Sequence, residues 1–280
     1  MPGTKSLRSK LLAIDLFSGE PSTRRNRPEF GVCKQKEISV GASMMFQPPL
    51  VLDNNNGDTA KNFPISLEIY SSHSDKTDLH RLRYRAFLAA GWIRENDAGM
   101  LSDRFDALDT TVAVGAFHKG ACIGALRLAF GGAHALPHSM PCEDAFPDEV
   151  RALIAQNCQR LVEFSRMAVE PTLSNRSFRT TLYASLVRAG VMLTIASRVD
   201  MAVVAVHKKV SPFYQAMCGF EVLGKSASYA EIDEPTEFLG LRAQALEARR
   251  KKRSGFFAFS PEEIAAAERA LARLSAQGLA

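Results

Sequence analysis

The sequence is poor in the features that mark secreted, membrane-spanning and metal-binding proteins. Its five cysteines are odd in number and form no Cys-x-x-Cys pair, so they predict neither a disulfide framework nor a metal site. Charges interrupt the long apolar runs well before the roughly 18 residues that a membrane span needs. The first residues lack an apolar core followed by a small-residue cleavage site, and we therefore expect a cytoplasmic protein.

The composition is otherwise that of a folded domain. The chain has 280 residues, 46% of them hydrophobic, and a net charge of +5 that is concentrated in the basic run 249–253. Such a run is usually a solvated segment, but it also suits an acidic protein partner or peripheral contact with an anionic membrane. No aromatic residues interleave with it, so we expect no nucleic-acid partner.

Three regions follow from the distribution of turn-forming and periodic segments. Residues 1–62 combine turn formers and charges without periodicity, which predicts a disordered N-terminal arm. Residues 63–245 carry strand and helix patterns in the order β, α, β, β, α, β, α, β, α, β, which predicts a single α/β sandwich around a mixed sheet. Residues 246–280 predict a basic linker and a C-terminal helix outside the main body, which begins with Ser260 as cap and Glu263 completing a capping box.

Charged residues fall inside elements that should be buried. Three are basic and three are acidic: Arg83, Arg127, Arg166, Asp103, Asp106 and Glu163. An isolated buried charge costs several kcal/mol, so a balanced set predicts one paired network lining a cleft. The alternative is a set of unrelated edge residues whose stems cover the core while their charged ends reach water.

Four segments carry a resemblance to a known family. The stretches "LRYRAFLAAGW", "SDRFD", "GALRL" and "EFSRMAV" resemble the acyl-homoserine-lactone synthases and the related N-acyl amino acid synthases, which share the GNAT acyltransferase fold with a mostly antiparallel sheet. The resemblance covers roughly residues 65–245. It implies an ion-pair network with a candidate general base, Glu163, and the further site residues Arg83, Phe87, Trp92, Asp103, Asp106, Arg127, Ser165 and Arg166.

The resemblance also implies the substrates. The donor would be a fatty acyl chain on the phosphopantetheine arm of acyl carrier protein, with no tightly bound cofactor. The stretch "VEPTLSNRSFRTTL" lacks the glycines with which acetyl-CoA-dependent members of the fold hold pyrophosphate, which disfavours acyl-CoA. The later stretch "VHKKVSPFYQAMCGFEVLG" is more similar to N-acyl amino acid synthases, for which the acceptor is an amino acid.

Other functions stay open at this point. The related lactone synthases use S-adenosylmethionine as acceptor, and ornithine-lipid acyltransferases share the early charged pattern. A different class is a non-catalytic acyl-binding or regulatory relative, which would keep Phe87 and Trp92 but would not need Glu163.

Acyl transfer to an amine requires a base for the ammonium group and an acid for the leaving thiol. We expect Glu163 to be the base and Tyr214 to be the acid, with His207 as the alternative acid. Arg166 or Arg83 would bind the acceptor's carboxylate, because a guanidinium matches it with two hydrogen bonds. Cys158 and Cys218 have no recognisable histidine partner, so we expect no acyl-cysteine intermediate.

The strand "RLVEFSRMAV" poses a geometric problem for this site. Strict alternation places Arg166 on the face of Val162 and Phe164, opposite Glu163. If both charges serve one cleft, the strand must be bulged or splayed between or beside them. We therefore predict a bulge that keeps Glu163 facing the cleft and ties Arg166 to Asp103 or Asp106.

Overall fold

The computed structural model describes residues 42–44, 65–135, 137–226, 229, 235–251 and 257–277. The N-terminal arm expected over residues 1–62 therefore lies outside the described residues, except for the strand β1 (Ala42–Met44), which pairs with β2 (Ser66–Tyr70).

An open sheet forms the centre of the protein. Its spatial order is β1-β2-β3-β4-β5-β6-β8-β7, and among the described strands β5 and β6 are the one parallel pair. The remaining strands are β3 (Thr111–His118), β4 (Ala121–Gly132), β5 (Arg160–Val169), β6 (Met201–His207), β7 (Glu221–Ser226) and β8 (Thr236–Arg242). The prediction of a mixed, mostly antiparallel sheet is confirmed.

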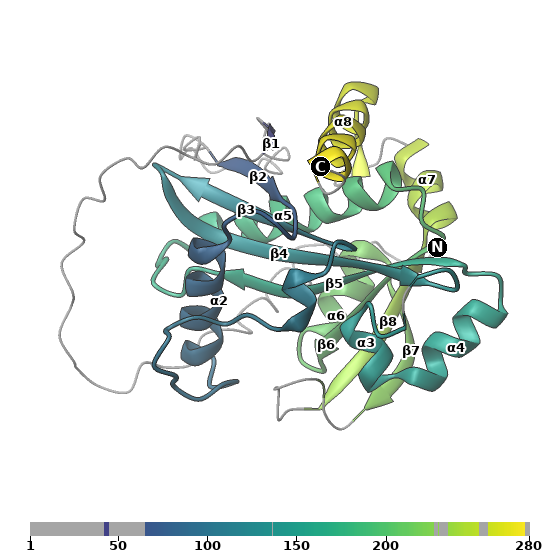
Figure 1. The fold of residues 1–280 in the computed structure, drawn as a ribbon, viewed down its shortest axis with the longest axis horizontal. Helices are drawn as coiled ribbons and strands as arrows, with labels where there is room; N and C mark the ends of the chain where they lie inside the picture. Colours follow the sequence, from purple (N-terminus) through teal and green to yellow (C-terminus); the bar gives the residue numbers. More distant parts are fainter. Residues whose placement is uncertain are drawn as a thin grey trace, which may run out of the picture.

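Helices cover both faces of this sheet, as Figure 1 shows. One face carries α2 (Thr77–Ala89), the 3-10 helix η2 (Arg104–Ala107), α3 (Pro141–Ala145) and α4 (Pro147–Ala155). The other face carries α5 (Arg176–Ala196), on which α8 (Pro261–Gln277) packs. Two further helices are α6 (Ser211–Phe213), which continues as a π turn (η3, Tyr214–Cys218), and α7 (Ala243–Lys251).

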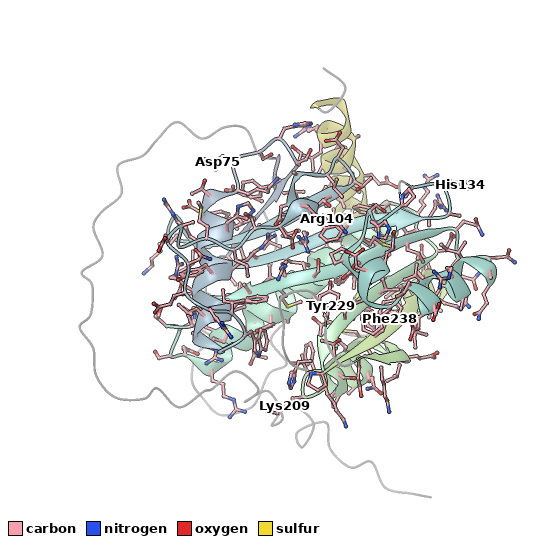
Figure 2. The ribbon with its side chains drawn as sticks, turned by 60° about the horizontal axis from the view of Figure 1, so that its bottom comes forward. Asp75, Arg104, His134, Lys209, Tyr229 and Phe238 are labelled. Carbon is pink, nitrogen blue, oxygen red and sulfur yellow. The ribbon has the colours of Figure 1, made fainter. Side chains whose placement is uncertain are left out.

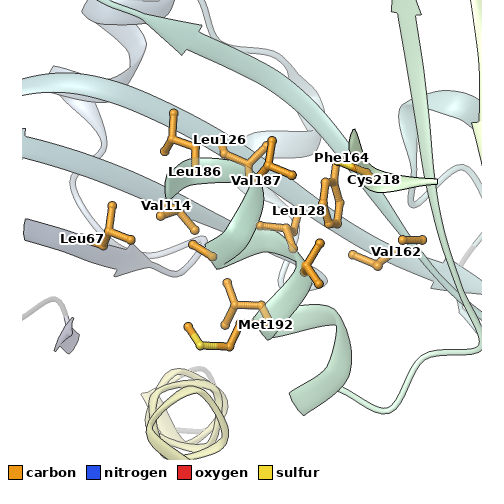
Figure 3. Packing of buried hydrophobic residues seen from close by; sticks show 14 of the residues in the cluster. Leu67, Val114, Leu126, Leu128, Val162, Phe164, Leu186, Val187, Met192 and Cys218 are labelled. Atoms are coloured by element: carbon orange, nitrogen blue, oxygen red, sulfur yellow. The ribbon is translucent and has the colours of Figure 1, made fainter. Parts of the chain in front are cut away.

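The main core lies between the sheet and α5 (Figure 3). Alternate residues of β4 and β5 point into it, and they pack with one face of α5: Leu126, Leu128, Val162, Phe164, Leu186 and Val187. Gly190 allows this helix to approach the sheet closely, since a Cβ atom there would lie 2.8 Å from the ring of Phe164. The intervening residues of β4 and β5 therefore point to the other face of the sheet, which carries α2 and α3.

Local signals in the sequence are confirmed at two turns. Lys119 and Gly120 have φ values of 50° and 78° and join β3 to β4 in a two-residue hairpin turn. Gly219 directly follows the π turn Tyr214–Cys218 and ends it with a φ of 75°, as expected of a glycine at a helix C-terminus.

The C-terminal region differs from the prediction in two respects. Ser260 and Glu263 form the expected capping box, but α8 does not lie outside the main body, because Ala267, Ala270 and Leu274 are buried in the main core. The basic run is not simply a linker either, since residues 249–251 belong to α7. Strong helix formers such as Ala, Leu, Gln, Glu and Arg dominate that segment, and its Leu246 is buried.

Candidate active site

A bulge in β5 places two opposite charges on one face of the sheet. Ala125 of β4 pairs with Ala168, whereas Arg127 pairs with Ser165, so one residue of β4 opposes both Arg166 and Met167. Arg166 adopts a left-handed conformation with a φ of 52°. The extra residue moves Arg166 away from the face of Phe164, and the predicted bulge is confirmed.

The two aspartates of "SDRFD" shape the loop that meets this bulge. Asp103 caps η2 by accepting a hydrogen bond from the backbone N–H of Phe105. Asp106 reaches back and accepts one from the backbone N–H of Asp103, at 3.1 Å. This reciprocal capping box fixes both carboxylates in a short segment and aims them at the sheet.

Three arginines from three elements pair with these two carboxylates. Arg166 of β5 donates to Asp103 through Nε and Nη2, at 3.0 and 2.7 Å. Arg127 of β4 binds Asp103 at 2.5 Å and lies 3.4 Å from Asp106, and Arg83 of α2 binds Asp106 at 2.7 Å. The three arginines and Asp106 are buried, and the side chain of Asp103 is 11% exposed. Three guanidinium groups face two carboxylates, so the network carries one positive charge in excess.

The electrostatics of the aspartates follow from these pairs. Burial alone would raise the pKa of Asp106, but Arg83 and Arg127 outweigh it and hold the pKa well below its usual value. Burial likewise opposes ionisation of Asp103, and Arg127 with Arg166 lowers its pKa overall. Both aspartates are therefore ionised at neutral pH, which maintains the attraction that holds the network together.

Glu163 lies on the same face but in a separate hydrogen-bonded group. Its side chain is fully buried; Oε2 accepts a hydrogen bond from the backbone N–H of Cys142 at 2.7 Å, and Oε1 accepts a short one from the hydroxyl of Tyr229. Burial raises the pKa of Glu163, although these donors and the charge of Arg127 oppose the rise. The carboxylate is thus a stronger base than an exposed glutamate.

The remaining polar residue of the motif, Ser165, belongs to the arginine network. Ser165 pairs with Arg127 in the sheet and accepts a hydrogen bond from its Nε at 3.0 Å. Two positions before it on β5 is Glu163, and directly after it is Arg166. Six of the predicted residues therefore form one connected network, and Glu163 lies beside it.

Two aromatic residues border the network at the end of α2. The ring of Phe87 lies 5.9 Å from the guanidinium of Arg166 and meets Trp92 edge to face at 5.3 Å. Phe87, Trp92 and Met167 line a cavity of about 40 Å³, little more than the space of one water molecule. A fatty chain at this place requires the lining side chains to move apart.

The strands β5 and β6 separate beside these aromatic residues. Within these two strands, pairing ends at Phe164 and Val204, although β5 continues to Val169 and β6 to His207. The ring of Trp92 stacks on His207 at 6.4 Å, across the open end of the pair. Peptide groups of β5 beyond Phe164 are consequently not used in a ladder with β6.

The structure places Tyr214 apart from Glu163. Tyr214 is buried in the core on the α5 face, where its hydroxyl lies 3.9 Å from the sulfur of Met167. Burial raises the pKa of Tyr214 far above its usual value. The alternative acid, His207, is partly exposed and accepts a hydrogen bond from the backbone N–H of Lys209 at 3.0 Å.

Sequence reasoning missed the residues that surround Glu163. Cys142 lies in α3, and Tyr229 comes from the segment between β7 and β8, where no periodic pattern singles it out. Figure 2 shows Tyr229 near Phe238, and both rings stack on Phe146, at 6.4 and 4.8 Å. Only the folded sheet brings them beside Glu163.

The fold and the site point to a family of acyltransferases, which comparison of the sequence identifies. The sequence model of one family, described as N-acyl amino acid synthase FeeM, matches residues 78–242. The chain belongs to that family. Among curated proteins, no sequence matches this chain.

The described residues contain no helix that is long and apolar enough to cross a membrane.

Solved structures are similar to this chain, and that of FeeM shares its fold. The structure of FeeM, an N-acyl amino acid synthase from uncultured soil microbes, is 19% identical with a TM-score of 0.52, over 64% of this chain and 91% of that one. The acyl-homoserine-lactone synthase LasI is 17% identical with a TM-score of 0.49, over 64% and 90%. TofI, solved with an inhibitor and MTA, is 16% identical with a TM-score of 0.49, over 70% and 98%.

Proposed function

We propose that this acyltransferase moves a fatty acyl chain from the phosphopantetheine thioester of acyl carrier protein to the amine of an amino acid. The observation that carries the proposal is the bulge of β5, which puts the buried base candidate Glu163 on the same face as a buried, positively charged arginine network. An amino acid offers a matching pair of groups, an ammonium for the base and a carboxylate for an arginine.

Glu163 would remove the proton that keeps the acceptor amine unreactive. The amine N–H bond breaks, directly or through one water, and the proton passes to a carboxylate oxygen of Glu163. The freed lone pair of nitrogen then attacks the thioester carbonyl and forms the C–N bond, and the C–S bond breaks. Nitrogen gives up a second proton as the amide forms, and the leaving thiolate takes up one proton, so a neutral thiol departs. Burial supports this role because it raises the pKa of Glu163, which makes its carboxylate a better proton acceptor.

The excess positive charge of the network suits the acceptor's carboxylate. Arg83 is fully buried, and neither its Nε nor its Nη2 has a hydrogen-bond partner within the described residues. Arg166 lies nearer the aromatic pair and already turns two donors toward Asp103. Either guanidinium would bind a carboxylate through two hydrogen bonds, and one more anion would balance the network.

The opening between β5 and β6 suits the thioester arm of the donor. Peptide N–H groups of β5 beyond Phe164 would polarise the carbonyl, and Trp92 with Phe87 would border the acyl chain. Tyr214, or alternatively His207, would return a proton to the leaving thiolate. Arg179 in the first turn of α5 lines the cavity beside this opening, and together with Arg176 at the start of that helix it would attract an acidic carrier protein.

Mass spectrometry of organic extracts from cells that overproduce the protein tests the proposal. We expect N-acyl amino acids with the wild type and none with Glu163→Gln. Glu68→Gln is a matched control, because Glu68 lies on β2, outside the site, and accepts a hydrogen bond from a tyrosine hydroxyl, that of Tyr70 at 2.7 Å. Lactones would instead identify S-adenosylmethionine as acceptor, and acylated lyso-ornithine lipids would identify ornithine. The absence of any acylated product would favour an acyl-binding or regulatory relative.

Purified components test the donor separately. With acyl carrier protein loaded with a dodecanoyl chain, the product should form, and its rate should fall as salt is added because the partners attract by charge. Equal rates with dodecanoyl-CoA, or rates that do not depend on salt, would contradict the assigned donor.

A further inference from the structure

The hydroxyl of Tyr229 is the only side-chain hydroxyl that the structure places on Glu163 among the described residues. Its donor bond goes to Oε1, while Oε2 is occupied by the backbone N–H of Cys142. All three groups are buried within the protein. Each oxygen of Glu163 therefore accepts a hydrogen bond from a protein donor.

The ring of Tyr229 is itself held in place by aromatic packing. Phe146, the residue between α3 and α4, stacks on Tyr229 at 6.4 Å and on Phe238 of β8 at 4.8 Å. The backbone donor Cys142 lies in α3, four residues before Phe146. The same small cluster thus orients both hydrogen-bond donors of Glu163. Such packing is expected around a carboxylate that must keep one orientation.

We propose that Tyr229 is a positioning residue for catalysis: its hydroxyl holds the buried carboxylate of Glu163 ionised and aligned to accept the proton of the acceptor amine. The proposal rests on the proposed function of Glu163 as the base. It assigns a role to a residue outside the strands and loop that carry the family motif. No proton leaves Tyr229 in this step, since its hydroxyl donates a hydrogen bond throughout.

The charge environment of Glu163 allows this role to be measured. The groups that face it are Arg127 from β4, the backbone N–H and thiol of Cys142 from α3, and Tyr229. Arg127 and the hydrogen bonds favour the ionised form, whereas burial opposes it. Removing the hydroxyl of Tyr229 removes a stabilising donor from the charged form alone, so protonation of Glu163 becomes easier.

The test compares Tyr229→Phe with Tyr70→Phe. The first keeps the ring that stacks on Phe146 and removes only the hydroxyl. The second removes a tyrosine hydroxyl that donates to Glu68 at 2.7 Å on β2, a matched pair outside the site. Infrared spectra recorded over a range of pH follow the protonated carboxyl band that Glu163→Gln abolishes, which needs no substrate. The dependence of kcat and KM on pH is measured with dodecanoyl acyl carrier protein and the acceptor found in the extracts.

In Tyr229→Phe, the midpoint of the Glu163 band and the acidic limb of kcat should both move to higher pH by about one unit, a tenfold change in the proton affinity. Tyr70→Phe should leave both unchanged. Unchanged midpoints in Tyr229→Phe, or an equal loss of kcat at every pH, would overturn the proposal. A moved band with an unmoved kcat limb would overturn it too.

A fluorinated tyrosine at position 229 keeps the proposal testable if Tyr229→Phe does not fold. Fluorine makes the phenol a stronger hydrogen-bond donor, so the band and the acidic limb should move to lower pH. Movement in the other direction, or none, would overturn the proposal. Failure of the proposed function is a separate result, since Glu163→Gln would then retain its acylated products whatever the behaviour of Tyr229.

Discussion

Arg166 donates two hydrogen bonds to one oxygen of Asp103, and the two residues are 63 positions apart in the chain. The contact exists because β5 contains one residue more than β4 at this place. A left-handed conformation of a non-glycine residue costs about 1 to 2 kcal/mol, so the bulge is maintained by the contacts of Arg166 rather than by local preference.

Replacing Arg166 with glycine should separate backbone strain from charge. Glycine relaxes the left-handed position, so we expect a folded protein, but acyl transfer should fall at least about tenfold because Asp103 loses both hydrogen bonds. Arg166→Lys should recover part of the activity at most, since an ammonium cannot reproduce the planar donor pair. Circular dichroism and product mass spectrometry measure the two effects, and full activity of the glycine variant would refute the role of Arg166.

Asp106→Asn should destabilise the fold strongly. It leaves the fully buried Arg83 without its anion, and breaking a buried pair in this way costs about 3 to 5 kcal/mol. The exposed pair of Arg104 and Asp144 provides the control, because Asp144→Asn should cost less than about 1 kcal/mol. Urea unfolding measures both, and similar losses in the two variants would show that burial does not matter here.

Glu163 should make the wild type less stable relative to Glu163→Gln as pH rises. Burial raises the folded pKa of Glu163 above the unfolded value of about 4.3, so its stabilising form is the protonated one. That contribution is complete below the unfolded pKa and is lost as pH rises through the folded pKa. The unfolding free energy of Glu163→Gln minus that of the wild type should therefore increase as pH rises from the unfolded pKa of about 4.3 through the folded pKa, and a constant difference would contradict the raised pKa.

Glu263 should anchor α8 to α5. It pairs with the buried Arg188 at 2.9 Å, which also donates to the carbonyl of Ala258 and lies 4.3 Å from the ring of Phe259. Glu263→Ala removes this pair and half of the capping box, and we expect a loss of about 2 kcal/mol. Glu268→Ala, on the exposed side of the same helix, should unfold at the wild-type urea concentration. Equal midpoints for both variants would remove Glu263 as the anchor.

Sequence reasoning reached the bulge because two local rules conflicted at Glu163 and Arg166. Strand alternation placed the two charges on opposite faces of β5, whereas a shared site required them on one face. A bulge in the strand was the solution that satisfied both rules. Tyr229 was beyond such reasoning, because it lies 66 positions from Glu163 and meets it only after β8 has paired with β6. The position of α8 was missed for a similar reason: its amphipathic pattern predicts a buried face but does not name the partner of that face.

The packing of α8 on α5 has a consequence for the synthesis of the protein. Leu274 of α8 belongs to the same apolar core cluster as Leu67 of β2, so two elements that are far apart in the sequence meet in it. A growing chain on the ribosome lacks part of this cluster until residue 274 has emerged. The sheet can begin to assemble earlier, but the α5 face is sealed from water only after translation has passed α8.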